Sequence, residues 1–113
     1  SYLFLHLTSA PTLKAFYSDH FVLPLPTGHR FPMQKYRLIH EAALASISDI
    51  DFHEAPTTSD GVLALAHHPH YIAAVSNGTL TENVQKAIGF PWTRQMVERS
   101  RRSAGATIAA CRA

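Results

Sequence analysis

Only two short stretches of this sequence have the composition of β-strands, and this scarcity limits the folds that the chain can adopt. The candidates are residues 13–18 and residues 51–55, the second of which is closed by Pro56. Most other segments have helical spacing or begin with residues that cap helices. A sheet covered by helices needs more strands than two, so the pattern indicates part of a helix-rich α/β protein.

A proline-rich segment follows the first strand candidate. Residues 21–32 contain three prolines and one glycine. Proline cannot donate a ladder hydrogen bond and disfavours helical geometry in the residue before it, so we expect a loop. The loop is apolar, which favours a packed position or a pocket wall over a solvent-facing connection. Pro32 is expected to open a helix with Met33, Tyr36 and His40 on one face.

Capping residues predict where the later helices begin and end. The expected starts are Ser59, Pro69, Thr79 and Thr93. The second of these helices should stop at Asn77-Gly78 and the third near Gly89. Alanine, serine, threonine and glycine fill most of residues 103–110 in the last helix, which implies close packing against something large.

Basic residues are concentrated near the end of the chain, although the net charge is only +2. The five concerned are Arg94, Arg99, Arg101, Arg102 and Arg112, against a single acid, Glu98. Such a cluster on a helix is typical of a solvated face. The small net charge gives no support of its own for a nucleic-acid partner, so a helix that binds DNA or RNA is the less favoured interpretation.

The cysteine count and the hydropathy pattern bear on where the protein works. A single cysteine, Cys111, excludes an internal disulfide and suits a reducing compartment, with the thiol as a small core residue. No apolar run approaches the roughly 20 residues needed to cross a membrane, so no membrane partner is expected. The first residues are apolar but lack the basic start of a signal peptide. The default compartment is the cytoplasm, with an organelle or the nucleus left open.

Histidine is the conspicuous residue type, with eight in 113 residues. The densest cluster lies in residues 67–70 (HHPH), and imidazoles of this kind can bind zinc or copper. Adjacent side chains point apart and a proline interrupts them, so we favour a helix start with one packed and two exposed histidines. Asp51 and His53 should share one face of a strand, and Asp19 precedes His20. Single pairs of this kind are more typical of a surface than of a metal site.

Three parts of the sequence, in this order, resemble the histone deacetylase superfamily. Residues 15–20 (AFYSDH) followed by residues 26–37 (PTGHRFPMQKYR) resemble the opening strand and first loop of its class IV-like bacterial and plant members. Residues 65–72 (LAHHPHYI) resemble a family segment in which a leucine precedes histidine, proline and tyrosine at alternate positions, as His67, Pro69 and Tyr71 stand here. Residues 88–93 (IGFPWT), followed by residues 101–108 (RRSAGATI), resemble the helix that leads toward the catalytic centre.

The resemblance implies a three-layer arginase-like α/β fold with a parallel sheet. Residues 13–113 would be the N-terminal portion of a single, incomplete deacetylase domain, and residues 1–12 would be a foreign or upstream extension. The implied activity is hydrolysis of acetyl-lysine or acetylated amines to amine and acetate. The implied partners are an acetylated protein or a small amine substrate, together with the remainder of the deacetylase chain.

Zinc is implied only for the complete parent protein. In the family, two aspartates and a histidine hold the metal, a histidine pair acts as acid and base, and a tyrosine stabilises the oxyanion. Those elements follow the segments that this chain contains. The resemblance therefore implies no catalytic residue and no metal ligand in these 113 residues, and the isolated segment is expected to be inactive. The alternative is a truncated, non-catalytic binding or regulatory module of the same fold.

By resemblance, the chain supplies pocket structure and a structural motif. Four side chains are expected near the internal cavity below the zinc: Tyr17, His29, Phe31 and Lys35. Lys35 would be a cation that guides acetate, with a surface lysine as the alternative, and core packing is the favoured alternative for the two aromatic residues. The structural motif consists of His67, Pro69 and Tyr71, as a buried histidine bonded to backbone, a helix start and a packed ring.

Overall fold

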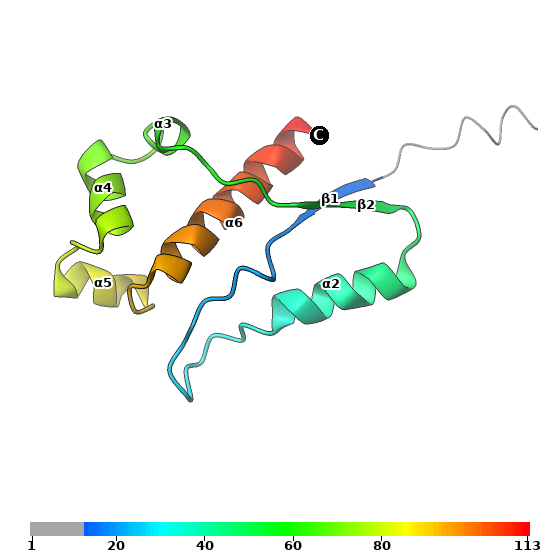
Figure 1. Cartoon of the computed structure of the whole chain (residues 1–113), viewed down its shortest axis with the longest axis horizontal. Coiled ribbons are helices and arrows are strands. Elements are labelled where there is room, and N and C mark those ends of the chain that lie inside the picture. Colours follow the sequence, from blue (N-terminus) through cyan, green and yellow to red (C-terminus); the bar gives the residue numbers. More distant parts are fainter. Residues whose placement is uncertain (1–12) are drawn as a thin grey trace, which may run out of the picture.

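The computed structural model describes residues 13–113, and the interpretation of residues 1–12 as an extension lies outside the described residues. The elements in chain order are β1 (Leu13–Tyr17), α2 (Lys35–Ser46), β2 (Ile50–Glu54), α3 (Asp60–Leu63), α4 (Pro69–Asn77), α5 (Glu82–Ile88) and α6 (Arg94–Arg112) (Figure 1). Helices therefore combine with a small sheet, as expected for an α/β chain.

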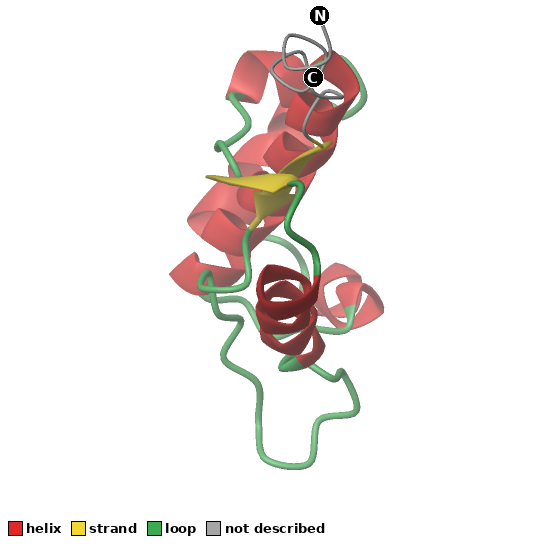
Figure 2. Cartoon of the chain, turned by 90° about the vertical axis from the view of Figure 1, so that its right-hand side faces the viewer, coloured by secondary structure: helices red, strands yellow, loops and turns green. Residues whose placement is uncertain are grey.

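The two strands pair in parallel through a crossover that contains α2. Leu13 lies opposite Ile50 and Tyr17 lies opposite Glu54. The backbone N–H of Ala55 extends the ladder by donating to the carbonyl of Tyr17 at 2.8 Å. Figures 1 and 2 show α2 below the strands and α6 passing alongside them. Both expected strands are confirmed to within one residue at each end.

Side-chain caps and left-handed glycines set most of the helix ends that the sequence predicts. Ser59 and Thr93 cap α3 and α6, with their hydroxyl oxygens accepting from N–H groups three residues later. Gly78 and Gly89 follow α4 and α5 with φ of 71° and 87°. These left-handed conformations suit glycine, so the two predicted stops are confirmed.

Two helix starts differ from the sequence prediction. The N-cap of α5 is Thr81 rather than Thr79, because the N–H of Thr79 donates to the carbonyl of Ala74 at 2.9 Å and helps to close α4. Regular helix α2 begins at Lys35 rather than at Pro32, because a turn comes first, in which the N–H of Lys35 donates to the carbonyl of Pro32 at 3.1 Å. In both cases a neighbouring turn uses the backbone groups that the simpler pattern assigned to the helix.

Helix α6 packs directly on the backbone that follows β2. Gly105 is buried, and an added Cβ atom would overlap the carbonyl oxygen of Pro56. The hydroxyl of Thr58 donates to the carbonyl of Arg101 at 3.0 Å, and Nη1 of Arg101 donates to the carbonyl of Thr58 at 2.9 Å. The small residues of α6 thus permit a close backbone contact, as their composition suggested, although the contact at Gly105 is with a loop.

Three of the five arginines in the cluster of α6 do not lie on a solvated face. Arg99 is buried, and Arg101 and Arg102 are half-buried. Nη2 of Arg101 lies 2.6 Å from Asp60, and Nε of Arg102 lies 2.9 Å from Glu98. The expectation of a solvated cluster is therefore wrong for these three residues. The segment between β2 and α3 contacts Arg101 and Arg102, whereas Arg99 stacks on Tyr36 of α2.

A further correction concerns Cys111, which was expected to be a small core residue. It is exposed in the last turn of α6. None of the helices in residues 13–113 combines the length and the apolar composition that a membrane crossing requires.

Much apolar surface remains exposed on the described residues. The buried apolar side chains are Leu23, Ala55, Ile72 and Met96. No residue of α2 is buried, and several of its large apolar side chains are more than half exposed: Leu38, Ile39 and Leu44. The core therefore lies mainly along α6, and α2 presents apolar side chains to solvent.

Candidate ligand-binding site

A cavity of about 450 Å³ lies between the proline-rich loop, the first turn of α2 and α6. Its larger lining side chains are Leu23, Phe31, Tyr36, Phe90, Met96 and Arg99. The other lining residues are small residues of α6. The cavity is therefore mostly apolar and aromatic, with a single guanidinium group, which is the composition of a small-molecule site.

The guanidinium group of Arg99 is the unusual feature of this cavity. Arg99 is 9% exposed, and its Cζ lies 4.5 Å from the centre of the Tyr36 ring. Its Nη1 is buried and has no hydrogen-bond partner among residues 13–113. A buried charge without an ionic partner is unfavourable, and stacking on an aromatic face offsets only part of that cost.

His29 holds the proline-rich loop in place beside the cavity. Its Nε2 donates to the carbonyl of Gly89 at 3.1 Å, and its Nδ1 accepts from the N–H of Phe31 at the same distance. The ring also stacks on Phe90, with centroids 5.7 Å apart. These two bonds require the neutral tautomer with its proton on Nε2. His29 is exposed and does not line the cavity, so its part is to fix the loop.

Phe31 and Lys35 were also expected near a cavity, and they differ in position. Phe31 lines the cavity and meets the Phe90 ring edge-on, with centroids 5.1 Å apart. Lys35 is exposed, with its Nζ 5.2 Å from the Phe31 ring and 5.0 Å from the Tyr36 ring. Two cations, Lys35 and Arg99, therefore lie on the ring of Tyr36.

Tyr17 lies in a neighbouring cavity of about 400 Å³ between the strands, α2 and α6. Its ring stacks on that of His40, with centroids 4.4 Å apart. His40 donates through Nδ1 to the carboxylate of Asp19 at 2.8 Å, and both side chains are largely buried. Tyr36 lines this cavity as well, so the structure places Tyr17 next to the candidate site but not in it.

The pairing of Asp19 with His40 was missed by the sequence analysis, which paired Asp19 with the adjacent His20. His20 instead donates through Nε2 to Glu54 at 3.1 Å. The crossover brings α2 against the carboxyl end of β1, so His40 meets a residue 21 positions earlier. The sequence pattern placed His40 on one face of this helix with Met33 and Tyr36, and that was the only signal for this contact.

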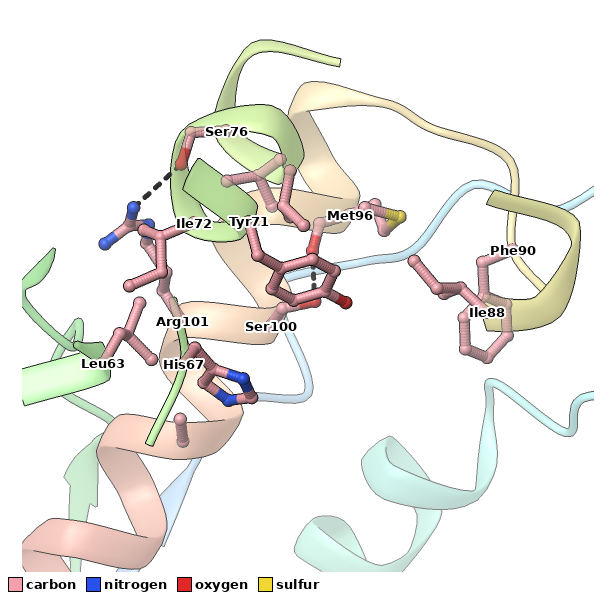
Figure 3. A pocket seen from close by; sticks show the side chains of 13 residues that line it. Leu63, His67, Tyr71, Ile72, Ser76, Ile88, Phe90, Met96, Ser100 and Arg101 are labelled. Atoms are coloured by element: carbon pink, nitrogen blue, oxygen red, sulfur yellow. Dashed lines mark hydrogen bonds between the residues drawn. The ribbon is translucent and has the colours of Figure 1, made fainter. Parts of the chain in front are cut away.

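Of the motif residues His67, Pro69 and Tyr71, the first and the last line a third cavity, of about 340 Å³, between α3, α4, α5 and α6 (Figure 3). Pro69 is the first residue of α4, which confirms the expected helix start. His67 is exposed and its ring lies 5.7 Å from that of Tyr71, which is itself 40% exposed. The expectation of a buried His67 bonded to backbone is therefore wrong.

The backbone bond expected of His67 is made by its neighbour, His68. Its Nδ1 accepts from the N–H of His70 at 3.1 Å, because His68 is the N-cap of α4. In the same cavity, Nη2 of Arg101 donates to Ser76 at 2.9 Å (Figure 3).

No group of three metal-ligating side chains comes together within residues 13–113. Asp51 and His53 do share a face, with Oδ2 and Nε2 2.8 Å apart, but both are about half exposed and have no third ligand. The described residues thus do not fit a zinc centre, which needs at least three protein ligands. No chemical step is assigned to a metal on this chain.

No protein-family model matches the chain. It is 37% identical over 94 residues to an uncharacterized protein of Picosynechococcus sp.. The match covers 81% of this chain and 31% of that protein. The chain therefore spans about a third of the length of the curated relative it matches.

Proposed function

We propose that this chain is the N-terminal portion of a zinc-dependent deacetylase that hydrolyses acetyl-lysine or acetylated amines to amine and acetate. The observation that carries the proposal is the presence, in the family's order, of three parts of the sequence that resemble the superfamily. Contacts within the chain support the proposal, because the first of these parts packs against the third. His29 donates to the carbonyl of Gly89, and the ring of Phe31 contacts that of Phe90.

We further propose that the two-stranded sheet is the start of the larger parallel sheet of a three-layer arginase-like fold. The β1–α2–β2 crossover is the unit from which such sheets are built. The exposed apolar side chains of α2, among them Leu38 and Leu44, support the idea that further structure covers this helix. The length of the Picosynechococcus relative would accommodate such structure.

In this proposal, zinc and the groups that react belong to the longer protein. Zinc, when bound there, would polarise the acetyl carbonyl and activate water. Residues 13–113 would contribute the wall of the internal cavity, with Phe31 in the wall and His29 fixing its loop. Lys35 would add positive charge outside the same aromatic rings, where it could guide the acetate product.

The test compares the 113-residue chain with a longer form of the protein that extends beyond Ala113. Acetate release from an acetyl-lysine peptide and from an acetylated polyamine would be measured before and after treatment with a chelator, and again after zinc is restored. We expect chelator-sensitive, zinc-restored hydrolysis by the longer form and none by the 113 residues alone.

Two results would count against this function. Chelator-sensitive acetate release by the 113-residue chain would overturn the assignment of all zinc ligands to the longer protein. A well-folded, zinc-loaded longer form that hydrolyses neither substrate would overturn the deacetylase proposal itself.

A further inference from the structure

We propose that Arg99 is the anchor of a binding site for a carboxylate with a small apolar substituent. The site is the cavity lined by Phe31, Tyr36, Phe90 and Arg99, and the proposal does not depend on the deacetylase function. A carboxylate would receive hydrogen bonds from the guanidinium group, while its apolar part would contact the aromatic rings.

Part of the hydrogen-bonding capacity of Arg99 is unmet among the described residues. The residue is only 9% exposed, yet its buried Nη1 has no hydrogen-bond partner among the described residues. Guanidinium groups remain charged at any pH that a folded protein tolerates, so the buried group needs an anion rather than a change of protonation. The planar group presents paired N–H donors at the spacing of the two oxygens of a carboxylate.

Arg99 differs in its pairing from the neighbouring arginines on the same helix. Arg101 is bonded to Asp60 and to the carbonyl of Thr58, and Arg102 is bonded to Glu98 and Glu54. No ion pair of Arg99 occurs in residues 13–113, although it is the most buried of the three. Within residues 13–113, the half-buried Arg101 and Arg102 are therefore paired with carboxylates, whereas the more buried Arg99, which lines a cavity, is not.

The charge and the lining of the cavity favour a carboxylate over other anions. Lys35 and Arg99 both lie on the Tyr36 ring, so the local potential is positive. Apart from the hydroxyl groups of Tyr36 and of the small α6 residues, the other lining groups are apolar, and a monovalent anion balances the single buried charge. A phosphate group would leave more oxygens without donors than a carboxylate would. An alkyl carboxylate such as butyrate therefore fits both the charge and the apolar wall.

The carboxylate could be a free small molecule, or an aspartate or glutamate side chain in a longer form of the protein. Both would satisfy the same guanidinium group. We would titrate sodium butyrate into isotope-labelled protein and follow the Nε–H signal of Arg99 and the ring signals of Tyr36 by NMR. Butyramide, a neutral compound of the same shape, and sodium chloride at matched ionic strength are the ligand controls.

We expect saturable shifts of the Arg99 and Tyr36 signals with butyrate, at least about tenfold weaker binding of butyramide, and no saturable shift with chloride. Arg99→Met should weaken butyrate binding by about tenfold or more. The matched control is Arg94→Met, at an exposed position of the same helix, which should bind as the wild type does. Saturation in both forms of the protein identifies a free ligand.

If butyrate gives saturable shifts in the 113-residue chain but not in the longer form, a carboxylate side chain of the longer form already occupies the site. That result also supports the proposed recognition of a carboxylate by Arg99. The proposal is overturned if neither form gives a saturable shift at Arg99, if chloride or butyramide binds as well as butyrate, or if Arg94→Met and Arg99→Met behave alike. The wild-type titration decides the matter even if Arg99→Met does not fold. All these readouts are of binding, so failure of the deacetylase assay leaves them intact.

Discussion

Replacing Gly105 with alanine tests how α6 is held against the segment that follows β2. An alanine Cβ would overlap the carbonyl oxygen of Pro56, lie 2.8 Å from the carbonyl carbon and lie 3.3 Å from the hydroxyl oxygen of Thr58. The obstacle at Pro56 is backbone, which cannot rotate away as a flexible side chain could. The helix and the loop must therefore move apart.

The size of the effect follows from three contributions to the free energy of unfolding. Overpacking a close contact costs about 1–3 kcal/mol. Separation also strains the two hydrogen bonds from the N–H and the hydroxyl of Thr58 to the carbonyl of Arg101, worth about 1 kcal/mol each. Alanine recovers about 1 kcal/mol through its better helix propensity. We expect a net loss of about 2–4 kcal/mol.

The assay is urea unfolding followed by the fluorescence of Trp92, the single tryptophan. Its indole N–H donates to the carbonyl of Val75 at 2.7 Å, so its signal reports on the packed state. Gly61→Ala in α3 is the matched control, because the nearest atom to the added Cβ, the Ser59 hydroxyl oxygen, lies at 4.0 Å. The control should be neutral or slightly stabilising. Wild-type stability in Gly105→Ala would refute the close contact between α6 and Pro56.

Two further substitution experiments test local features of the fold. Thr81→Ala should lower the free energy of unfolding by about 1 kcal/mol, because it removes the N-cap of α5. Thr79→Ala should change the free energy of unfolding little, because it leaves the backbone bond to Ala74 intact. Equal effects of the two substitutions in urea unfolding would contradict this assignment of the cap. A double-mutant cycle of Asp19→Ala and His40→Ala should give a coupling energy of about 1 kcal/mol from their 2.8 Å hydrogen bond. A coupling energy near zero would show that this hydrogen bond contributes nothing to stability.

Local signals predicted the elements well because the interactions that set them are local. Ser59 and Thr93 satisfy N–H groups three residues away, and Gly78 and Gly89 adopt a backbone conformation that other residues disfavour. The prediction failed where two local motifs compete. Thr79 has capping-box spacing, but its N–H is already used to close α4, so the cap moves to Thr81.

The contacts of the site were only partly predictable, because they depend on how distant segments meet. Phe31 was expected near a cavity only because of the family resemblance, and its contact with Phe90 joins residues far apart in the sequence. Arg99 was missed because arginine on a helix usually reaches solvent. Residues three apart lie on the same side of a helix, so Arg99 lies on the side of Met96, and both residues are buried in the structure.

The missing partner of Arg99 is not explained by a shortage of carboxylates near it in the sequence. Glu98 is adjacent to it, but its side chain bonds to Arg102 one turn later, the spacing at which helical side chains meet. An apolar residue at position 99 would pack against Tyr36 without the cost of an unpaired buried charge. Retaining arginine there is therefore unfavourable for the stability of residues 13–113 taken alone. A ligand or a side chain that supplies the missing negative charge would remove that cost, and the cavity beside Tyr36 is where it can enter.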